Sequence, residues 1–270
     1  MRLLLERLAT AAALAAIALP LWLAATASLS PEARLFEGAV WIPREFVLEH
    51  YRALASHPDI WLGLRNSLVV AGATTALCLP IGALCAYALA RLRFRGRAAM
   101  LALVMATAMF PQIAIVSPLY LLLRALGLIH SYPGLVLPYL SFALPLTVWL
   151  LVGYLRQLPA EVEHAARLDG ASRARVLGEI VLPLAAPALA ATGILTFLYC
   201  WNEFLFALSF TLGPERQTLP VAIALLRGQY QVPWGTILAA AMVSSAPVAV
   251  LVLVFQRRIT AGLVAGAVKG

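Results

Sequence analysis

An all-α integral membrane protein with six transmembrane helices is the fold class that this sequence predicts. Hydrophobic residues occupy 63% of the 270 positions and charged residues only 12%, about half of the ~25% usual in soluble domains. The mean hydropathy is +0.90. Six apolar runs reach the roughly 20 residues that a helix needs to cross a bilayer. They lie near Leu8–Ser28, Trp61–Ala90, Ala98–Leu123, Pro133–Leu155, Leu182–Phe210 and Gly235–Phe255.

The first run has two interpretations. Ala25-Thr26-Ala27 resembles a signal-peptide cleavage site, and cleavage would leave five spans. The apolar stretch, however, is longer than the roughly 7–15 residues of a signal core. We therefore expect residues 1–60 to form a retained transmembrane helix followed by an external loop.

The other five runs lie within residues 61–257, and several contain prolines. A membrane helix tolerates proline where neighbouring helices or water satisfy the freed carbonyl groups. The large number of prolines predicts bends in these helices, and the bent segments would line a shared cavity. The prolines within the runs are Pro80, Pro111, Pro118, Pro138, Pro145 and Pro247.

Arginine placement predicts the orientation. Of the 20 basic residues, 19 are arginine and the other is Lys269. Thirteen of the 20 lie before the first run, between the second and third, between the fourth and fifth, or after the sixth. Because cytoplasmic loops carry the excess of arginine and lysine, we expect a multi-pass cell-membrane protein with both termini and residues 158–181 in the cytoplasm.

Composition argues against several kinds of function. A nucleotide-binding P-loop needs a lysine followed by Ser or Thr, but Lys269 precedes only Gly270, so ATP-driven work would need a partner ATPase. The arginines flank apolar runs, which favours membrane lipid over nucleic acid as their partner. Cys78, Cys85 and Cys200 lie in apolar runs and are expected to be small buried residues. We expect no metal, no bound cofactor and no catalysis in this chain.

Residues 158–181 form a charged, helix-prone segment between two apolar runs. Pro159 suits a helix start, and Glu161 and Glu163 complement the positive end of the helix dipole. Asp169-Gly170 can end this helix with a residue in the left-handed conformation.

Ser172 can cap a second helix over Arg173–Ile180, before Pro183 marks the entry into the next run. The short helix–turn–helix has the size of a plug for a protein cleft, although a solvated loop on lipid headgroups would fit the same pattern.

The motifs of this segment resemble the EAA loop of ABC importer permeases. They read Ala165-Ala166-Arg167-Leu168-Asp169-Gly170-Ala171, then Ile180-Val181-Leu182-Pro183 and Pro187. Three further motifs look like those of carbohydrate-importer permeases: Arg65-Asn66-Ser67-Leu68, Phe110-Pro111 and Trp201-Asn202-Glu203-Phe204. The tail from Gln256 to Gly270 is similar to the inner permease subunit of maltose and trehalose importers.

The resemblance covers nearly the whole chain and implies the type I ABC importer permease fold. Residues 61–257 would be the permease core with a coupling loop at 158–181, and residues 258–270 a cytoplasmic tail. The implied partners are a second unlike permease, a dimer of ATPase subunits that hold ATP and Mg, and an extracytoplasmic sugar-binding protein. The residues implied in ATPase coupling are Glu161, Glu163, His164, Ala165, Ala166, Asp169, Gly170 and Arg173. The tail residues implied to reach the ATPase are Gly266, Lys269 and Gly270.

His164 departs from the family pattern, which usually has glutamate immediately before the two alanines. In the family that glutamate contacts the ATPase subunit. Glu163 is adjacent but points about 100° away around a helix, so it is not a simple replacement. We expect a neutral His164 side chain that packs against its surroundings or forms a hydrogen bond.

Within the membrane, Glu203 is the only acidic residue well inside an apolar run, with Asn202 beside it. Such a residue usually faces protein or water, so it would line or gate the sugar path or bond to another helix. Gln112, Ser117 and Tyr120 lie near a double-proline bend. They would offer a sugar hydrogen bonds and an aromatic face, while Gln112 could equally satisfy freed backbone.

The expected function is ATP-driven import of a di- or oligosaccharide, with trehalose or maltose favoured by the tail. Glycerol 3-phosphate is an alternative cargo, but a phosphate would ask for cations within the membrane, and no central one is present. A proton-coupled secondary transporter that uses Glu203 is a more distant alternative.

Overall fold

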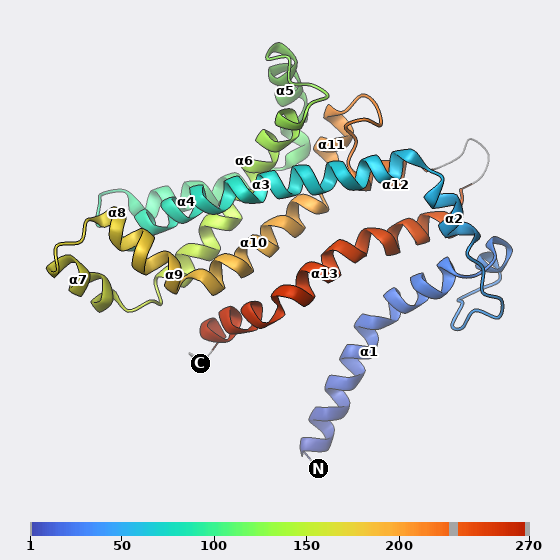
Figure 1. Ribbon diagram of the computed structural model, residues 1–270, viewed down its shortest axis with the longest axis horizontal. Coiled ribbons are helices and arrows are strands. Elements are labelled where there is room, and N and C mark those ends of the chain that lie inside the picture. The colour runs from blue at the N-terminus through green and yellow to red at the C-terminus, as the bar shows by residue number, and fades with distance from the viewer. Residues whose placement is uncertain (1, 227–231, 268–270) are drawn as a thin grey trace.

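The computed structural model describes residues 2–226 and 232–267, and this part of the chain consists of helices and connecting loops (Figure 1). Four helices are long and apolar enough to cross a membrane. If each of two bent helix pairs counts as one further span, the number rises to six, in agreement with the predicted class. The four long helices are α1 (Arg2–Ser28), α3 (Pro58–Arg91), α6 (Tyr132–Leu155) and α13 (Trp234–Ala267).

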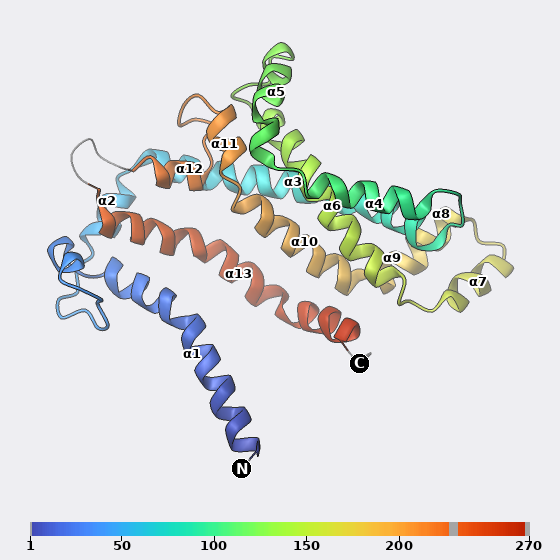
Figure 2. The same cartoon turned by 180° about the vertical axis from the view of Figure 1, so that it is seen from behind.

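Helices α3 and α6 pack along each other at the centre of the bundle, and α10 (Ala186–Trp201) packs against both (Figures 1 and 2). Helix α13 lies beside α10. The C-terminal end of α1 lies beside the start of α13, and the N-terminal part of α1 diverges from the bundle (Figure 2). Gly82 lets α3 and α6 approach closely, because an added Cβ there would lie 2.6 Å from Cγ2 of Thr147.

The third predicted span, Ala98–Leu123, is a sharply bent pair of helices. The structure divides it into α4 (Arg97–Ala108) and α5 (Gln112–Ala125), which are bent by 89° relative to each other. Pro111 explains the break, since it has no N–H to continue the helix and disfavours a helical conformation in the residue before it. The predicted bend is therefore confirmed here, whereas Pro80 and Pro118 lie inside continuous helices.

The fifth predicted span, Leu182–Phe210, is also divided. Its first part continues the preceding helix, bends by 76° at Ala185, and continues as α10. The second polar helix, expected over Arg173–Ile180 with Pro183 at the entry into the next span, continues through Pro183 to Leu184. Pro187 has no backbone N–H, so the hydrogen bond that would extend this helix beyond Leu184 without a bend cannot form. The short elements here are α8 (Arg173–Val176), a π-helical turn η2 (Leu177–Val181), α9 (Leu182–Leu184) and α11 (Leu205–Phe210).

The buried core lies in two clusters along the bundle. One surrounds Tyr139, Phe206 and Phe210, and the other lies near Val176 and Val181. Cys78 and Cys200 are buried as predicted. Cys85 is exposed on the surface of α3 in this single chain, which corrects the expectation for that residue.

The two ends of the bundle carry different short elements. The α7 end carries α7 (Ala160–Leu168), α8, α9 and the turn between α3 and α4 (Figure 1). The α12 end carries η1 (Glu32–Phe36), α2 (Glu49–Ala55) and α12 (Leu219–Ala224). At the α12 end, the Glu32 carboxylate accepts hydrogen bonds from the amides of Trp234 (2.8 Å) and Gly235 (3.0 Å), which caps α13.

Candidate functional site

Local sequence chemistry shapes helix α7 as predicted. Pro159 lies at its N-cap, and Gly170 has a φ of +86° just after its C-cap residue Asp169. The Gly170 N–H donates to the Arg167 carbonyl at 3.1 Å. Only glycine adopts this left-handed conformation without a steric penalty, so the chain turns here.

The second polar helix begins with the predicted cap. The Ser172 hydroxyl accepts a hydrogen bond from the Arg175 amide at 3.3 Å. From this cap the chain runs through α8, η2 and α9 directly into the bend before α10. Only the four-residue turn over residues 169–172 therefore separates α7 from this path into a membrane helix.

One face of α7 is fastened to the bundle. Glu163 is buried, and its Oε1 lies 2.6 Å from Nε of Arg91 at the end of α3. Its other oxygen accepts a hydrogen bond from the Tyr87 hydroxyl at 3.2 Å. Arg91 also donates to the Leu158 carbonyl at 2.7 Å. Glu163 thus faces its own bundle and serves as an internal anchor of α7.

The opposite face of α7 is open. Leu168 is 89% exposed and Val162 is 43% exposed. Two large apolar side chains are therefore exposed on this charged helix. Of the predicted coupling residues, those on exposed positions are Glu161, His164, Ala165, Asp169, Gly170 and Arg173, while Ala166 is half-buried.

A second feature is a cavity of about 820 Å³ where α5, α6 and α10 meet at the break before α11. Gln112, Asn202 and Glu203 all line it, so the structure brings these three predicted residues together. The Gln112 amide donates to the Tyr199 hydroxyl at 2.9 Å. Ser117 and Tyr120 lie outside this lining, and Tyr120 packs its ring 6.4 Å from that of Phe210.

Three aromatic residues of this cavity were missed by the sequence reasoning. Trp149, Tyr199 and Phe204 line it and are 54%, 37% and 39% exposed in the single chain. Aromatic faces beside amide groups suit a polyhydroxylated ligand. Trp149 and Tyr199 are spaced in apolar runs like ordinary core residues, so no sequence signal distinguished them. Phe204, in contrast, ends the motif Trp201-Asn202-Glu203-Phe204 and could have been chosen from it.

Glu203 has a structural role at the break between α10 and α11. Its carboxylate accepts hydrogen bonds from the amides of Phe206 (2.8 Å) and Ala207 (3.2 Å), which are free donors at the start of α11. Asn202 turns back to donate to the Leu198 carbonyl at 2.8 Å. The Glu203 side chain thus satisfies backbone amides that the break leaves open, whereas the Leu198 carbonyl also accepts the backbone amide of Asn202 at 3.1 Å.

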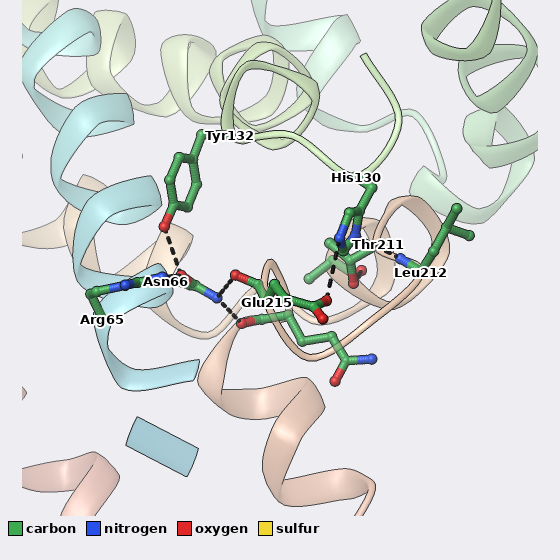
Figure 3. Close-up of polar contacts among 9 residues, drawn as sticks. Arg65, Asn66, His130, Tyr132, Thr211, Leu212 and Glu215 are labelled. Atoms are coloured by element: carbon green, nitrogen blue, oxygen red, sulfur yellow. Dashed lines mark hydrogen bonds and ion pairs between the residues drawn. The ribbon is translucent and has the colours of Figure 1, made fainter. Parts of the chain in front are cut away.

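A buried polar clamp lies at the α12 end (Figure 3). The Asn66 amide donates to the carbonyls of Glu215 (3.0 Å) and Gln217 (2.8 Å), and its oxygen accepts from the Tyr132 hydroxyl at 2.7 Å. The neighbouring Ser67 hydroxyl accepts from the Leu219 amide at 2.8 Å. The motif that includes these two residues therefore fastens residues 215–219 to α3.

His130 fastens the same segment from the other side (Figure 3). Its Nδ1 accepts a hydrogen bond from the Leu212 amide at 3.1 Å, and its Nε2 lies 3.5 Å from a carboxylate oxygen of Glu215. Residues 211–219 are thus held at several points where they lead into the packed helix α12.

The tail is described only in part. Gly266 lies in the last turn of α13, which runs to Ala267, and Lys269 and Gly270 lie outside the described residues.

Known proteins with similar sequences indicate the family of this chain. Residues 79–264 match the family described as binding-protein-dependent transport system inner membrane component. The chain is 40% identical over 238 residues to a trehalose/maltose transport system permease protein of Thermococcus litoralis, which covers 87% of this chain and 86% of that protein. It is 41% identical over 251 residues to a sulfoquinovosyl glycerol transport system permease protein of Agrobacterium fabrum, which covers 93% and 88%.

A solved structure supports the fold. A chain in the crystal structure of a bacterial ABC transporter for import of the acidic polysaccharide alginate superposes with a TM-score of 0.75 at 22% identity, over 94% of this chain and 95% of that chain. The fold is therefore that of type I ABC importer permeases, and the chain is a membrane subunit without catalytic activity of its own. The chain belongs to the binding-protein-dependent transport system inner membrane component family, as a permease of the carbohydrate ABC importer type.

Proposed function

We propose that this chain is one of two unlike permease subunits of an importer that moves a di- or oligosaccharide into the cytoplasm. Two partner ATPase subunits would hold ATP and Mg, and an extracytoplasmic binding protein would deliver the sugar. The observation that carries the proposal is helix α7, which is fastened on one face by Glu163 and exposes Leu168 on the other.

Helix α7 would dock into a cleft of an ATPase subunit. The exposed Val162 and Leu168 would be covered by the cleft, and His164 would contact its rim. Positive-inside logic supports the matching orientation, with the α7 end and both termini in the cytoplasm. The tail residues Gly266, Lys269 and Gly270 would reach the same partner.

Closure of the ATPase pair would move α7, and two connections would pass the movement on. The Arg91–Glu163 pair links α7 to α3, and the path through α8, η2 and α9 links it to α10. Helix α10 lines the cavity that contains Gln112 and Asn202. A shift of this helix would therefore change the access to that cavity.

The lining of the cavity supports a neutral sugar as cargo. It has amide groups and three aromatic residues, and none of its lining residues is arginine or lysine. The similarity to a trehalose/maltose permease favours trehalose or maltose. Glycerol 3-phosphate would need a cation to balance its charge, and a proton-coupled mechanism would need a free carboxyl, whereas Glu203 accepts two backbone hydrogen bonds.

The test is sugar uptake by the complete importer in proteoliposomes, with internal or external ATP and the binding protein supplied outside. Trehalose, maltose, sulfoquinovosyl glycerol and glycerol 3-phosphate would be compared. We expect ATP-dependent uptake of a neutral disaccharide, and loss of binding-protein-stimulated ATP hydrolysis in Gly170→Pro and Asp169→Arg variants that still assemble. Uptake that survives without the ATPase subunits, or is unaffected by both substitutions, would contradict the proposal.

A further inference from the structure

A cavity of about 650 Å³ lies beneath α7, apart from the sugar path. Its walls are the end of α3, the turn between α3 and α4, and the inner side of α7 and α8. Five arginines and a single acidic residue line it, so the wall carries a formal charge of +4 when His164 is neutral. The arginines are Arg91, Arg93, Arg97, Arg167 and Arg173, and the acid is Glu163.

The one acidic residue is already paired. Glu163 forms its ion pair with Arg91 at 2.6 Å, which leaves four guanidinium groups to face the cavity. Among the residues that the structure describes, no carboxylate forms an ion pair with any of these four. Like charges gathered around one hollow repel each other, so an anion within it would be stabilised.

The position of the cavity indicates which anion is available. Arg91 is the last residue of the long apolar helix α3, and the turn after it places Arg93 beside Leu92 and the 40% exposed Phe94. Basic side chains interleaved with apolar ones at the end of a membrane helix lie at the level of the lipid headgroups. Arginine also binds phosphate oxygens in a bidentate geometry.

We propose that this cavity binds a phosphate group, supplied in the membrane by the headgroup of an anionic phospholipid. Arg93 and Arg97 would hold the headgroup from the α3–α4 side, and Arg167 and Arg173 from the α7 side. The bound lipid would thereby fasten the inner side of α7 to the membrane surface. The orientation rests on the proposed function, but the binding itself does not depend on transport.

The test uses the intact importer complex, purified in detergent, stripped of lipid, and titrated with phosphatidylglycerol while bound lipid is counted by native mass spectrometry. The variant Arg93→Gln/Arg97→Gln removes two cavity charges that are not on the coupling helix. Arg95→Gln/Arg156→Gln is the matched control, since it removes two arginines of the same end that do not line the cavity. Arg93→Lys/Arg97→Lys retains the charge if the glutamine variant fails to assemble.

We expect the apparent dissociation constant for the first phosphatidylglycerol to rise on the order of twenty-fold in the cavity variant, because each arginine near an anionic surface contributes a factor of about five. The control should bind like the wild type, and the lysine variant should retain most of the binding. Equal binding by cavity and control variants would overturn the proposal.

A parallel titration with inorganic phosphate distinguishes the source of the anion. If phosphate leaves lipid binding unchanged, the ligand is the lipid headgroup. If phosphate displaces the lipid with the same arginine dependence, the anion site stands and the free ion is its ligand. Cross-links from position 93 to acidic residues of the ATPase, together with absence of lipid from the assembled complex, would show that a protein fills the cavity and would refute the proposal. Lipid binding that persists in a complex inactive for sugar uptake would leave this site intact while the proposed function fails.

Discussion

Replacing Glu163 by glutamine removes one charge from the ion pair that fastens α7 to α3, with almost no change in side-chain size. The two side chains are 13% exposed for Arg91 and 12% for Glu163, and their closest atoms are 2.6 Å apart. Breaking a buried pair by neutralising one partner costs roughly 3–5 kcal/mol, because the other charge stays desolvated. The slight exposure favours the lower end, about 3 kcal/mol.

A loss of about 3 kcal/mol corresponds to roughly a hundred-fold shift in the equilibrium between anchored and released α7. The direct measurement is hydrogen exchange of the α7 backbone amides in the complete importer, which should become faster in Glu163→Gln. Binding-protein-stimulated ATP hydrolysis should fall in the same variant, because a released helix cannot transmit movement to α3.

The matched control is Glu179→Gln, which removes the same charge from an exposed ion pair of the same segment. Glu179 and Arg175 are 65% and 66% exposed and 3.1 Å apart, and an exposed pair of this kind contributes only about 0.3–0.5 kcal/mol. The double variant Arg91→Gln/Glu163→Gln should recover part of the loss, since no unpaired charge remains. If Glu163→Gln exchanged no faster than Glu179→Gln, the ion pair would not be what holds α7, and the reasoning would be refuted.

Three further predictions concern backbone and packing. Gly170→Ala should destabilise the turn after α7 by roughly 1–2 kcal/mol because of its φ of +86°, and it should lower stimulated ATP hydrolysis. Gly178→Ala is the control, because Gly178 has open space around it, and it should leave stimulated ATP hydrolysis unchanged. Gly82→Val should lower the melting temperature of the purified complex, with a loss of about 1–3 kcal/mol, since its Cβ would lie 2.6 Å from Thr147; an unchanged melting temperature would mean that α3 and α6 can separate freely. Asn66→Leu should cost about 1 kcal/mol by leaving two partly buried carbonyl groups without their donor, and should speed proteolysis within residues 211–218. Equal cleavage of variant and wild type would contradict the clamp.

The features predicted correctly from the sequence are those that depend on local chemistry. Apolar runs predict spans because a bilayer imposes a length on every helix. The outline of the polar helices is predictable because three residues act on the backbone next to them. The ring of Pro159 favours a helix start, the missing Cβ of Gly170 permits the turn, and the hydroxyl of Ser172 caps the second helix. Motifs along the chain were sufficient to indicate a carbohydrate ABC importer permease, which the comparisons confirm.

The features that the sequence left open depend on segments that are distant in the chain. The sequence shows both prolines, but it does not distinguish Pro111, at which the helix breaks, from Pro118, which lies inside a continuous helix. For Glu203 the sequence left open a role in lining or gating the sugar path or in bonding to another helix, and only the break before α11 shows that its carboxylate caps two amides.

The contacts of Glu163, within residues 158–181, also depend on a distant segment of the chain. Its helix position predicts where it points relative to His164, but not that the end of α3 places Arg91 against it. The arginine-lined cavity likewise exists only because the α3–α4 turn and α7 meet at one end of the bundle. Local chemistry therefore determined the spans, the turns and the family, whereas tertiary packing decided which charges meet, since that depends on distances between segments that no local pattern encodes.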